Sequence, residues 1–90
     1  MLKLKVTNQF KKDLKKIKKR GLDISKLDKI IGKLLNQEQL ENKYRDHSLV
    51  GNYLGFRECH IEPDWLLIYM IDDKELILTA SRTGTHSDLF

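Results

Sequence analysis

The first 21 residues change from a hydrophobic period of two to a period close to 3.6. Between residues 2 and 6, leucine and valine alternate with lysine, which predicts a short strand with one buried face. Between residues 10 and 17, apolar side chains recur at i, i+4 and i+7, and most positions between them are lysines. This spacing predicts an amphipathic helix that begins after Thr7 or Asn8 and ends at Gly21.

A broader apolar stripe follows between residues 27 and 35. Its members recur at i, i+3, i+4, i+7 and i+8, which is the pattern of a helix with one side against a core. Two residues are alternative N-caps of this helix. Asp23 would allow an apolar staple across the first turn, and Ser25 with Asp28 resembles a capping box. The short connection between the two helices predicts an antiparallel hairpin.

The second half of the chain has the composition of a sheet. Residues 36–46 are mostly polar and lack a period, which predicts a long connection. Strand-like segments separated by turn sequences then span residues 56–61, 65–71 and 76–82. The run 65–71 is apolar throughout, as is typical of a central strand covered on both faces. These segments predict a three-stranded antiparallel meander.

Together these elements predict an α+β fold, with the N-terminal strand at a sheet edge and the helix pair on one sheet face. With 90 residues, 40% of them apolar, the chain has room for one core, so residues 1–90 are expected to form one small soluble domain. A single cysteine excludes a disulfide framework. Since no apolar run approaches the roughly 20 residues of a membrane span, and the N-terminal sequence lacks an apolar signal region, we expect a cytoplasmic protein without a membrane partner.

Charge is unevenly distributed along the chain. Residues 1–45 hold 14 Lys and Arg against 5 Asp and Glu, whereas residues 46–90 hold 3 against 8. The densest cluster lies in the first predicted helix, at Lys11, Lys12, Lys15, Lys16, Lys18, Lys19 and Arg20. Such a cluster can bind a polyanion, and it equally serves as a solvated helix surface. All three histidines lie in the acidic half, where we therefore expect the chemistry.

Five residues near the ends of the predicted strands are candidates for that chemistry. Taken alone, each has a more common structural explanation. His60 would be a packed histidine, Trp65 a core residue and Arg82 the partner of a surface carboxylate. His47 and His86 lie in glycine-flanked loops, where a histidine is more often simply exposed.

The predicted meander makes these residues neighbours. The ends of its first and third strands lie at one sheet edge, so His60, Arg82 and His86 can meet there, with Asp64 in the nearby turn. Imidazoles, a carboxylate and a guanidinium suit RNA cleavage through the 2′-hydroxyl, because histidines can transfer the protons and arginine can stabilise the phosphorane. This reaction requires no metal. A zinc site is the weaker alternative, because the three histidines lack the short spacings of zinc motifs.

Three stretches of the second half carry a family resemblance. They are Asp46-His47-x-Leu49-x-Gly51, Gly55-x-Arg57-x-x-His60-x-x-Pro63-Asp64-Trp65-x-Leu67-Ile68-Tyr69 and Arg82-Thr83-Gly84-Thr85-His86-x-x-Leu89-Phe90. The pattern resembles the YafQ-type toxins of the RelE/ParE superfamily. The resemblance implies a RelE-like fold and a metal-independent endoribonuclease, without a small-molecule cofactor, that cuts messenger RNA in the ribosomal A site. It also implies a cognate antitoxin protein as partner.

The resemblance further implies an active-site set, which consists of His47, His60, Asp64, Trp65, Arg82, His86 and Phe90. Arg82 would stabilise the phosphate, and the histidines with Asp64 would share the base and acid roles. Which histidine is base and which is acid does not follow from sequence. Trp65 and Phe90 would hold the nucleotide by stacking. The cations of the first helix would bind ribosomal RNA.

Two other functions remain open at this point. The ParE branch of the superfamily poisons DNA gyrase and lacks the histidine complement, so the full set of histidines argues against that function. A basic RNA-binding module without catalysis would need only the lysine-rich helix, and no other sequence feature favours it.

Overall fold

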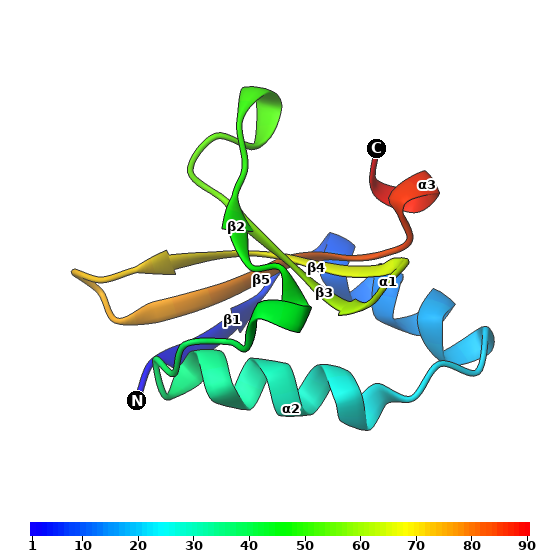
Figure 1. The fold of residues 1–90 in the computed structure, drawn as a ribbon, viewed down its shortest axis with the longest axis horizontal. Coiled ribbons are helices and arrows are strands. Elements are labelled where there is room, and N and C mark those ends of the chain that lie inside the picture. The colour runs from blue at the N-terminus through cyan, green and yellow to red at the C-terminus, as the bar shows by residue number, and fades with distance from the viewer.

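The centre of the fold is a five-stranded sheet with strand order β1-β5-β4-β3-β2 (Figure 1). It is seen in a computed structural model that describes residues 1–90. The strands are β1 (Lys3–Val6), β2 (His47–Ser48), β3 (Arg57–Glu62), β4 (Trp65–Asp72) and β5 (Ile77–Gly84). The antiparallel pairing of β3, β4 and β5 confirms the predicted meander. β1 pairs in parallel with β5 and forms one edge of the sheet, as predicted.

The strand β2 is absent from the sequence-based prediction. Its two residues pair antiparallel with β3, with His47 opposite Glu58 and Ser48 opposite Arg57. Two residues are too few to show an alternating pattern, so periodicity cannot detect this strand. Its pairing fixes the backbone of His47 on the sheet.

The helices are α1 (Asn8–Lys19), α2 (Ile24–Leu35) and α3 (His86–Leu89), with 3-10 turns η1 (Asn42–Tyr44) and η2 (Gly51–Tyr53). Thr7 caps α1, and Asp23 rather than Ser25 is the cap of α2. The prediction lacks α3, which begins with a capping box between Thr85 and Asp88. The sequence Thr-x-x-Asp was the available signal for this short helix.

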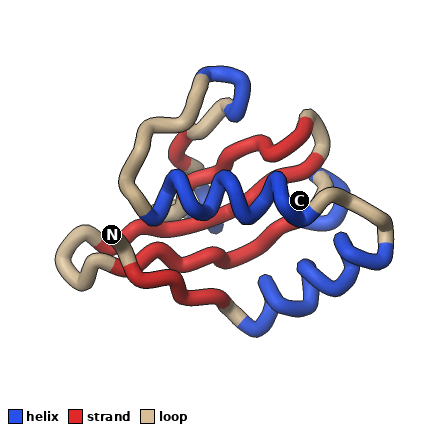
Figure 2. Tube along the Cα trace, turned by 90° about the horizontal axis from the view of Figure 1, so that it is seen from below, coloured by secondary structure: helices blue, strands red, loops and turns tan.

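α1 and α2 cover one face of the sheet, and they diverge from their connection (Figure 2). Apolar side chains of both helices join those of this sheet face in one core, in which Ile17, Leu27 and Leu67 are fully buried. The amphipathic spacing therefore predicted the buried side of each helix correctly. No helix has the length and apolar character needed to cross a membrane.

The opposite face of the sheet carries a much smaller apolar cluster. Leu66 and Ile68 of β4 pack there against Leu89 of α3. β4 is thus buried on both faces, as its continuous apolar run predicts. Beside this cluster, β3 and β5 present polar side chains, and these form the candidate site.

Candidate active site

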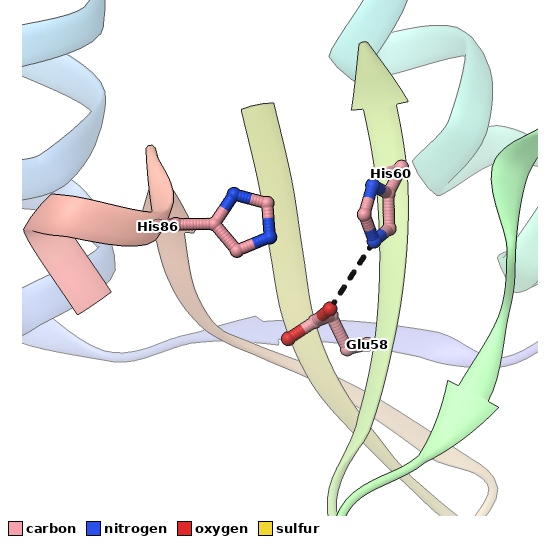
Figure 3. Close-up of side chains that lie close together, drawn as sticks. All are labelled: Glu58, His60 and His86. Carbon is pink, nitrogen blue, oxygen red and sulfur yellow. Dashed lines mark ion pairs between the residues drawn. The ribbon is translucent and has the colours of Figure 1, made fainter. Parts of the chain in front are cut away.

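The strand register brings two predicted site residues to the same margin of the sheet. His60 of β3 and Gly84 of β5 both lie opposite Leu66 of β4. Two residues after Gly84, the chain turns into α3 and carries His86 back over the sheet. The imidazole rings of His60 and His86 have centroids 5.6 Å apart and are tilted by 61° (Figure 3).

A second cross-strand row contains a carboxylate that the sequence analysis missed. Glu58 and Arg82 both lie opposite Ile68, so their backbones are level on the two sides of β4. Side chains of one cross-strand row project from the same face of a sheet. Arg82 therefore belongs to the sheet face that carries His60.

The carboxylate of Glu58 lies between two histidines. Its Oε1 is 3.4 Å from Nε2 of His60 and 3.7 Å from Nε2 of His47. Glu58 is only 5% exposed, and the rings of His47 and His60 have centroids 6.4 Å apart. A buried carboxylate is costly unless positive charge or hydrogen-bond donors compensate it. Glu58 is therefore placed to interact with both rings from the floor of the site.

Asp64 fixes the orientation of His86. One carboxylate oxygen of Asp64 accepts hydrogen bonds from the backbone N–H of His86 at 3.0 Å and from Nδ1 of its ring at 2.7 Å. Because an ionised carboxylate only accepts, Nδ1 carries a proton, and Nε2 is left for chemistry. The hydrogen bonds from the backbone and the ring of His86 lower the pKa of Asp64. Asp64 thus holds both the backbone and the ring of His86 in place.

His47 is oriented by the backbone. Its Nδ1 lies 2.6 Å from the carbonyl oxygen of Arg45, which can only accept a hydrogen bond. This contact directs Nε2 toward Glu58. Arg45 has a left-handed backbone, with φ 48° and ψ 42°, and this conformation turns its carbonyl toward the ring of His47.

The guanidinium of Arg82 is held by an acidic residue of α1. Nε of Arg82 donates to Oδ2 of Asp13 at 2.9 Å, and Nη2 donates to Oδ1 at 3.1 Å. Asp13 also accepts the backbone N–H of Thr83 at 3.2 Å. Burial raises the pKa of Asp13, but hydrogen bonds from Arg82, Gln9 and Thr83 outweigh this effect and hold it below the usual range. The hydrogen bond to Asp13 in turn raises the pKa of Arg82.

The expected stacking role of Trp65 is corrected by the structure. Trp65 is 1% exposed and belongs to the core between the helices and the sheet. Its Nε1 donates to Oγ1 of Thr83 at 2.9 Å, and this hydroxyl donates to the carbonyl of Leu66 at 2.7 Å. The ring has no free face for a base, because it stands on the helix side of the sheet rather than on the site side.

Phe90 has the exposure that Trp65 lacks. It is 64% exposed, and its ring lies edge-on to that of Tyr53 with centroids 5.6 Å apart. Tyr53 in η2 also packs against Phe56, at 6.1 Å between centroids. These three rings form an aromatic group beside the site, of which the sequence analysis found only Phe90.

The basic surface of α1 reaches the site at its C-terminal end. All seven of its cations are exposed, from Lys11 to Arg20. Arg20 donates to both carboxylate oxygens of Asp88, at 2.6 and 3.1 Å. Asp88 is the capping-box residue of α3, so Arg20 holds the helix that carries His86. Hydrogen bonds from Arg20 and from Thr85 keep the pKa of Asp88 well below its usual range.

Comparison with known proteins identifies the family of the chain. A family model described as the bacterial toxin of type II toxin-antitoxin system, YafQ, matches residues 2–90. The chain belongs to the YafQ toxin family. The mRNA interferase toxin YafQ of Escherichia coli K12 is 42% identical to it over 88 residues, which cover 97% of this chain and 94% of that protein.

Solved structures extend this relationship to the fold. A metal-bound toxin from Helicobacter pylori superimposes with a TM-score of 0.94 at 44% identity, and each chain is fully covered. YafQ in the DinJ–YafQ complex of E. coli gives a TM-score of 0.90 at 40% identity, over 100% of this chain and 99% of that one. The RelE-like architecture predicted from the sequence is that of the YafQ structures.

In this member of the YafQ family, three site residues could hold a metal ion. Glu58, His60 and His86 each offer one ligand atom, and these atoms lie within 4.8 Å of one another. Carboxylate oxygen and imidazole nitrogen are ordinary ligands of divalent transition metals, so the donor set fits such an ion. The spacing of the histidines in the sequence does not reveal this set, because the fold brings its members together.

Proposed function

We propose that this chain is a ribosome-dependent endoribonuclease toxin of the bacterial cytoplasm that cuts messenger RNA in the ribosomal A site. The observation that carries the proposal is the cluster of His47, His60 and His86 around Glu58, on the sheet face to which Arg82 belongs. The name of the E. coli relatives, mRNA interferase toxin, agrees with this chemistry.

In the proposed reaction, one imidazole takes the proton of the 2′-hydroxyl as its oxygen attacks the adjacent phosphorus. The bond from phosphorus to the 5′-oxygen breaks, and a second imidazole gives that oxygen a proton. The products are a 2′,3′-cyclic phosphate and a free 5′-hydroxyl. His60 and His86 are the proposed pair, because their rings lie close together, with centroids 5.6 Å apart. Arg82 would stabilise the charge on the phosphorane.

The mechanism that we propose uses no metal. An ion held by Glu58, His60 and His86 would supply positive charge near the phosphate. It would also occupy the imidazole nitrogens that the two proton transfers need. The side chains themselves carry the protons in our proposal.

Phe90 and the cations of α1 would contribute to binding. Phe90 is exposed beside the site and can stack on a base of the cut codon. Lys11, Lys12, Lys15, Lys16, Lys18 and Lys19 would contact ribosomal RNA, while Arg20 has the additional task of holding Asp88. A cognate antitoxin is the other proposed partner, as DinJ is for the E. coli toxin. An acidic segment that folds on binding would suit the basic surface of α1.

Mapping of transcript 5′ ends after a short induction tests the function. We expect new ends inside coding sequences, in register with codons, for the wild-type chain and none for His86→Ala. A growth arrest with DNA breaks and uncut messages would indicate gyrase poisoning instead. Expression without growth arrest would leave only a binding role.

Replacement of Glu58 by glutamine tests its role beside the histidines. Gln has the same shape but no charge, so the side chains of His47 and His60 lose a charged neighbour. We expect the single-turnover cleavage rate at neutral pH to fall by about tenfold. The melting temperature is expected to stay the same or rise, because the variant no longer buries a carboxylate. A lower melting temperature with unchanged cleavage would make Glu58 a structural residue.

A further inference from the structure

A cavity of about 590 Å³ opens beside the site, between α2, the turn η1 with Arg45, and the end of β3 with the turn that follows it. In Figure 1 the green turn just before β2 lies between the sheet and α2. Its walls carry four cations, which are Lys26, Lys29, Lys43 and Arg45. The only carboxylate in the lining is that of Glu62. None of these residues belongs to the catalytic cluster or to the basic surface of α1.

Three of the four cations, Lys29, Lys43 and Arg45, have no carboxylate partner. Lys26 lies 3.8 Å from Glu62, and Lys43 lies over the ring of Tyr44 at 5.1 Å from its centroid. Lys29 and Arg45 form no ion pair, and both are exposed. The lining therefore carries a net positive charge. An anion that enters the cavity finds three cations whose charge no carboxylate offsets, and two of them, Lys29 and Arg45, have no aromatic partner either.

The cavity is continuous with the candidate active site. His60 is one of its lining residues, and the same imidazole contacts Glu58 and faces His86. Arg45 also belongs to both, since it lines the cavity and its carbonyl orients His47. A substrate whose reacting phosphate lies at His60 therefore extends directly into this space.

We propose that the cavity is an RNA subsite that holds the nucleotide next to the cleaved bond, with its phosphate on Lys29 and Arg45. The proposal rests on the proposed nuclease function. The volume lies within the range of pockets that enclose one small ligand, about 300–1,000 Å³. The apolar floor of Ile30 and Ile61 suits a sugar or a base. RNA fits better than an acidic protein segment, because a substrate must reach His60 and an inhibitor need not.

The test compares Lys29→Gln and Arg45→Gln with Lys74→Gln as a matched control. Lys74 lies in the turn between β4 and β5, at the end of the sheet away from His60. Single-turnover cleavage of messages on programmed ribosomes gives the half-saturating toxin concentration and the saturated rate. Each cavity variant is expected to raise the half-saturating concentration about tenfold, and the control is expected to match wild type. The negative slope of log affinity against log salt is expected to become shallower by about 0.7 for each charge removed.

Shortened messages show whether the effect belongs to a subsite. Removing nucleotides stepwise on one side of the cleaved bond is expected to abolish the penalty of Lys29→Gln once the nucleotide in the cavity is gone. A penalty that persists with every shortened message would overturn the subsite, because it would reflect general attraction to RNA. Cavity variants that cleave like wild type but lose binding to the antitoxin would also overturn it and assign the cavity to that protein. A wild-type chain that cuts no message would refute the proposed function itself.

Discussion

Replacing His86 with glutamine is expected to lower the saturated rate of single-turnover RNA cleavage by a factor of about 10² to 10⁴. Glutamine is polar and of similar length, but it does not exchange a proton at neutral pH. Asp64 accepts the backbone N–H of residue 86 as well as the ring, so α3 keeps its attachment in the variant. The rate is measured at saturating toxin on programmed ribosomes, so that weaker binding does not contribute.

Asp64→Asn is the matched control, because Asp64 acts through His86. Asparagine can still accept the backbone N–H of residue 86, but it removes the charge beside Nδ1 of the ring. We expect about a tenfold loss of rate from Asp64→Asn alone and no further loss when it is added to His86→Gln. Losses that multiply in the double variant would show that Asp64 takes part in the reaction itself. Unchanged cleavage by His86→Gln would remove His86 from the mechanism.

The elements that are long enough to show a hydrophobic pattern could be predicted from the sequence. Both long helices have the hydrophobic period of a side packed against the core, and the strands of the meander are recognised by their apolar content and the turns between them. The order of the strands followed because short turns join antiparallel neighbours. The approach of His60 and His86 could be anticipated but not fixed, because strand register depends on pairs such as His60 with Leu66 and on an irregularity near residue 81.

Two acidic residues of the site could have been suspected from the same periods. Asp13 is three residues after Phe10 and four before Ile17, so it lies on the buried side of α1 within a run of lysines. Glu58 is two residues before His60 on the same strand, which places both side chains on one sheet face. A charged residue at an inward position is expensive to bury alone, and each of these has a cationic or imidazole partner elsewhere in the fold. That partner is what one sequence cannot identify.

The buried position of Trp65 could have been predicted from the sequence. Its place in the family pattern suggested a stacking surface, whereas core packing is the commoner role of a tryptophan that opens an apolar strand. The alternation along β4 separates the two roles: Trp65 shares its side of the strand with Leu67 and Tyr69, and both belong to the core under the helices. Leu66 and Ile68 are the residues that face the site.

Arg82→Lys is expected to lower the saturated cleavage rate by a factor of about 10² to 10³. The guanidinium uses Nε and Nη2 on Asp13, which leaves both Nη1 hydrogens and one of Nη2 for a phosphate. One planar group can thus hold two oxyanions at once. Lysine has a single ammonium on a flexible chain and cannot reproduce both geometries. Cleavage within about threefold of wild type would mean that Arg82 serves the fold alone.

Asp13→Asn separates the structural part of this interaction from the catalytic part. The variant leaves Arg82 partly buried without its counter-ion and weakens the hydrogen bond to the backbone of Thr83. It is expected to lower the free energy of unfolding by about 2 kcal/mol, or the melting temperature by about 10 °C.

Since the pKa of Asp13 is lowered by folding, the contribution of Asp13 to stability is complete above the unfolded value of about 3.9 and disappears as the pH falls through the folded value. The stability difference between wild type and Asp13→Asn is therefore expected to be constant near neutrality and to shrink in acid. A difference that grows on acidification would contradict an ionised Asp13 in the folded chain. Since the guanidinium of Arg82 is retained, cleavage by the folded variant is expected to fall less than in Arg82→Lys, because the missing partner only loosens the group that meets the phosphate.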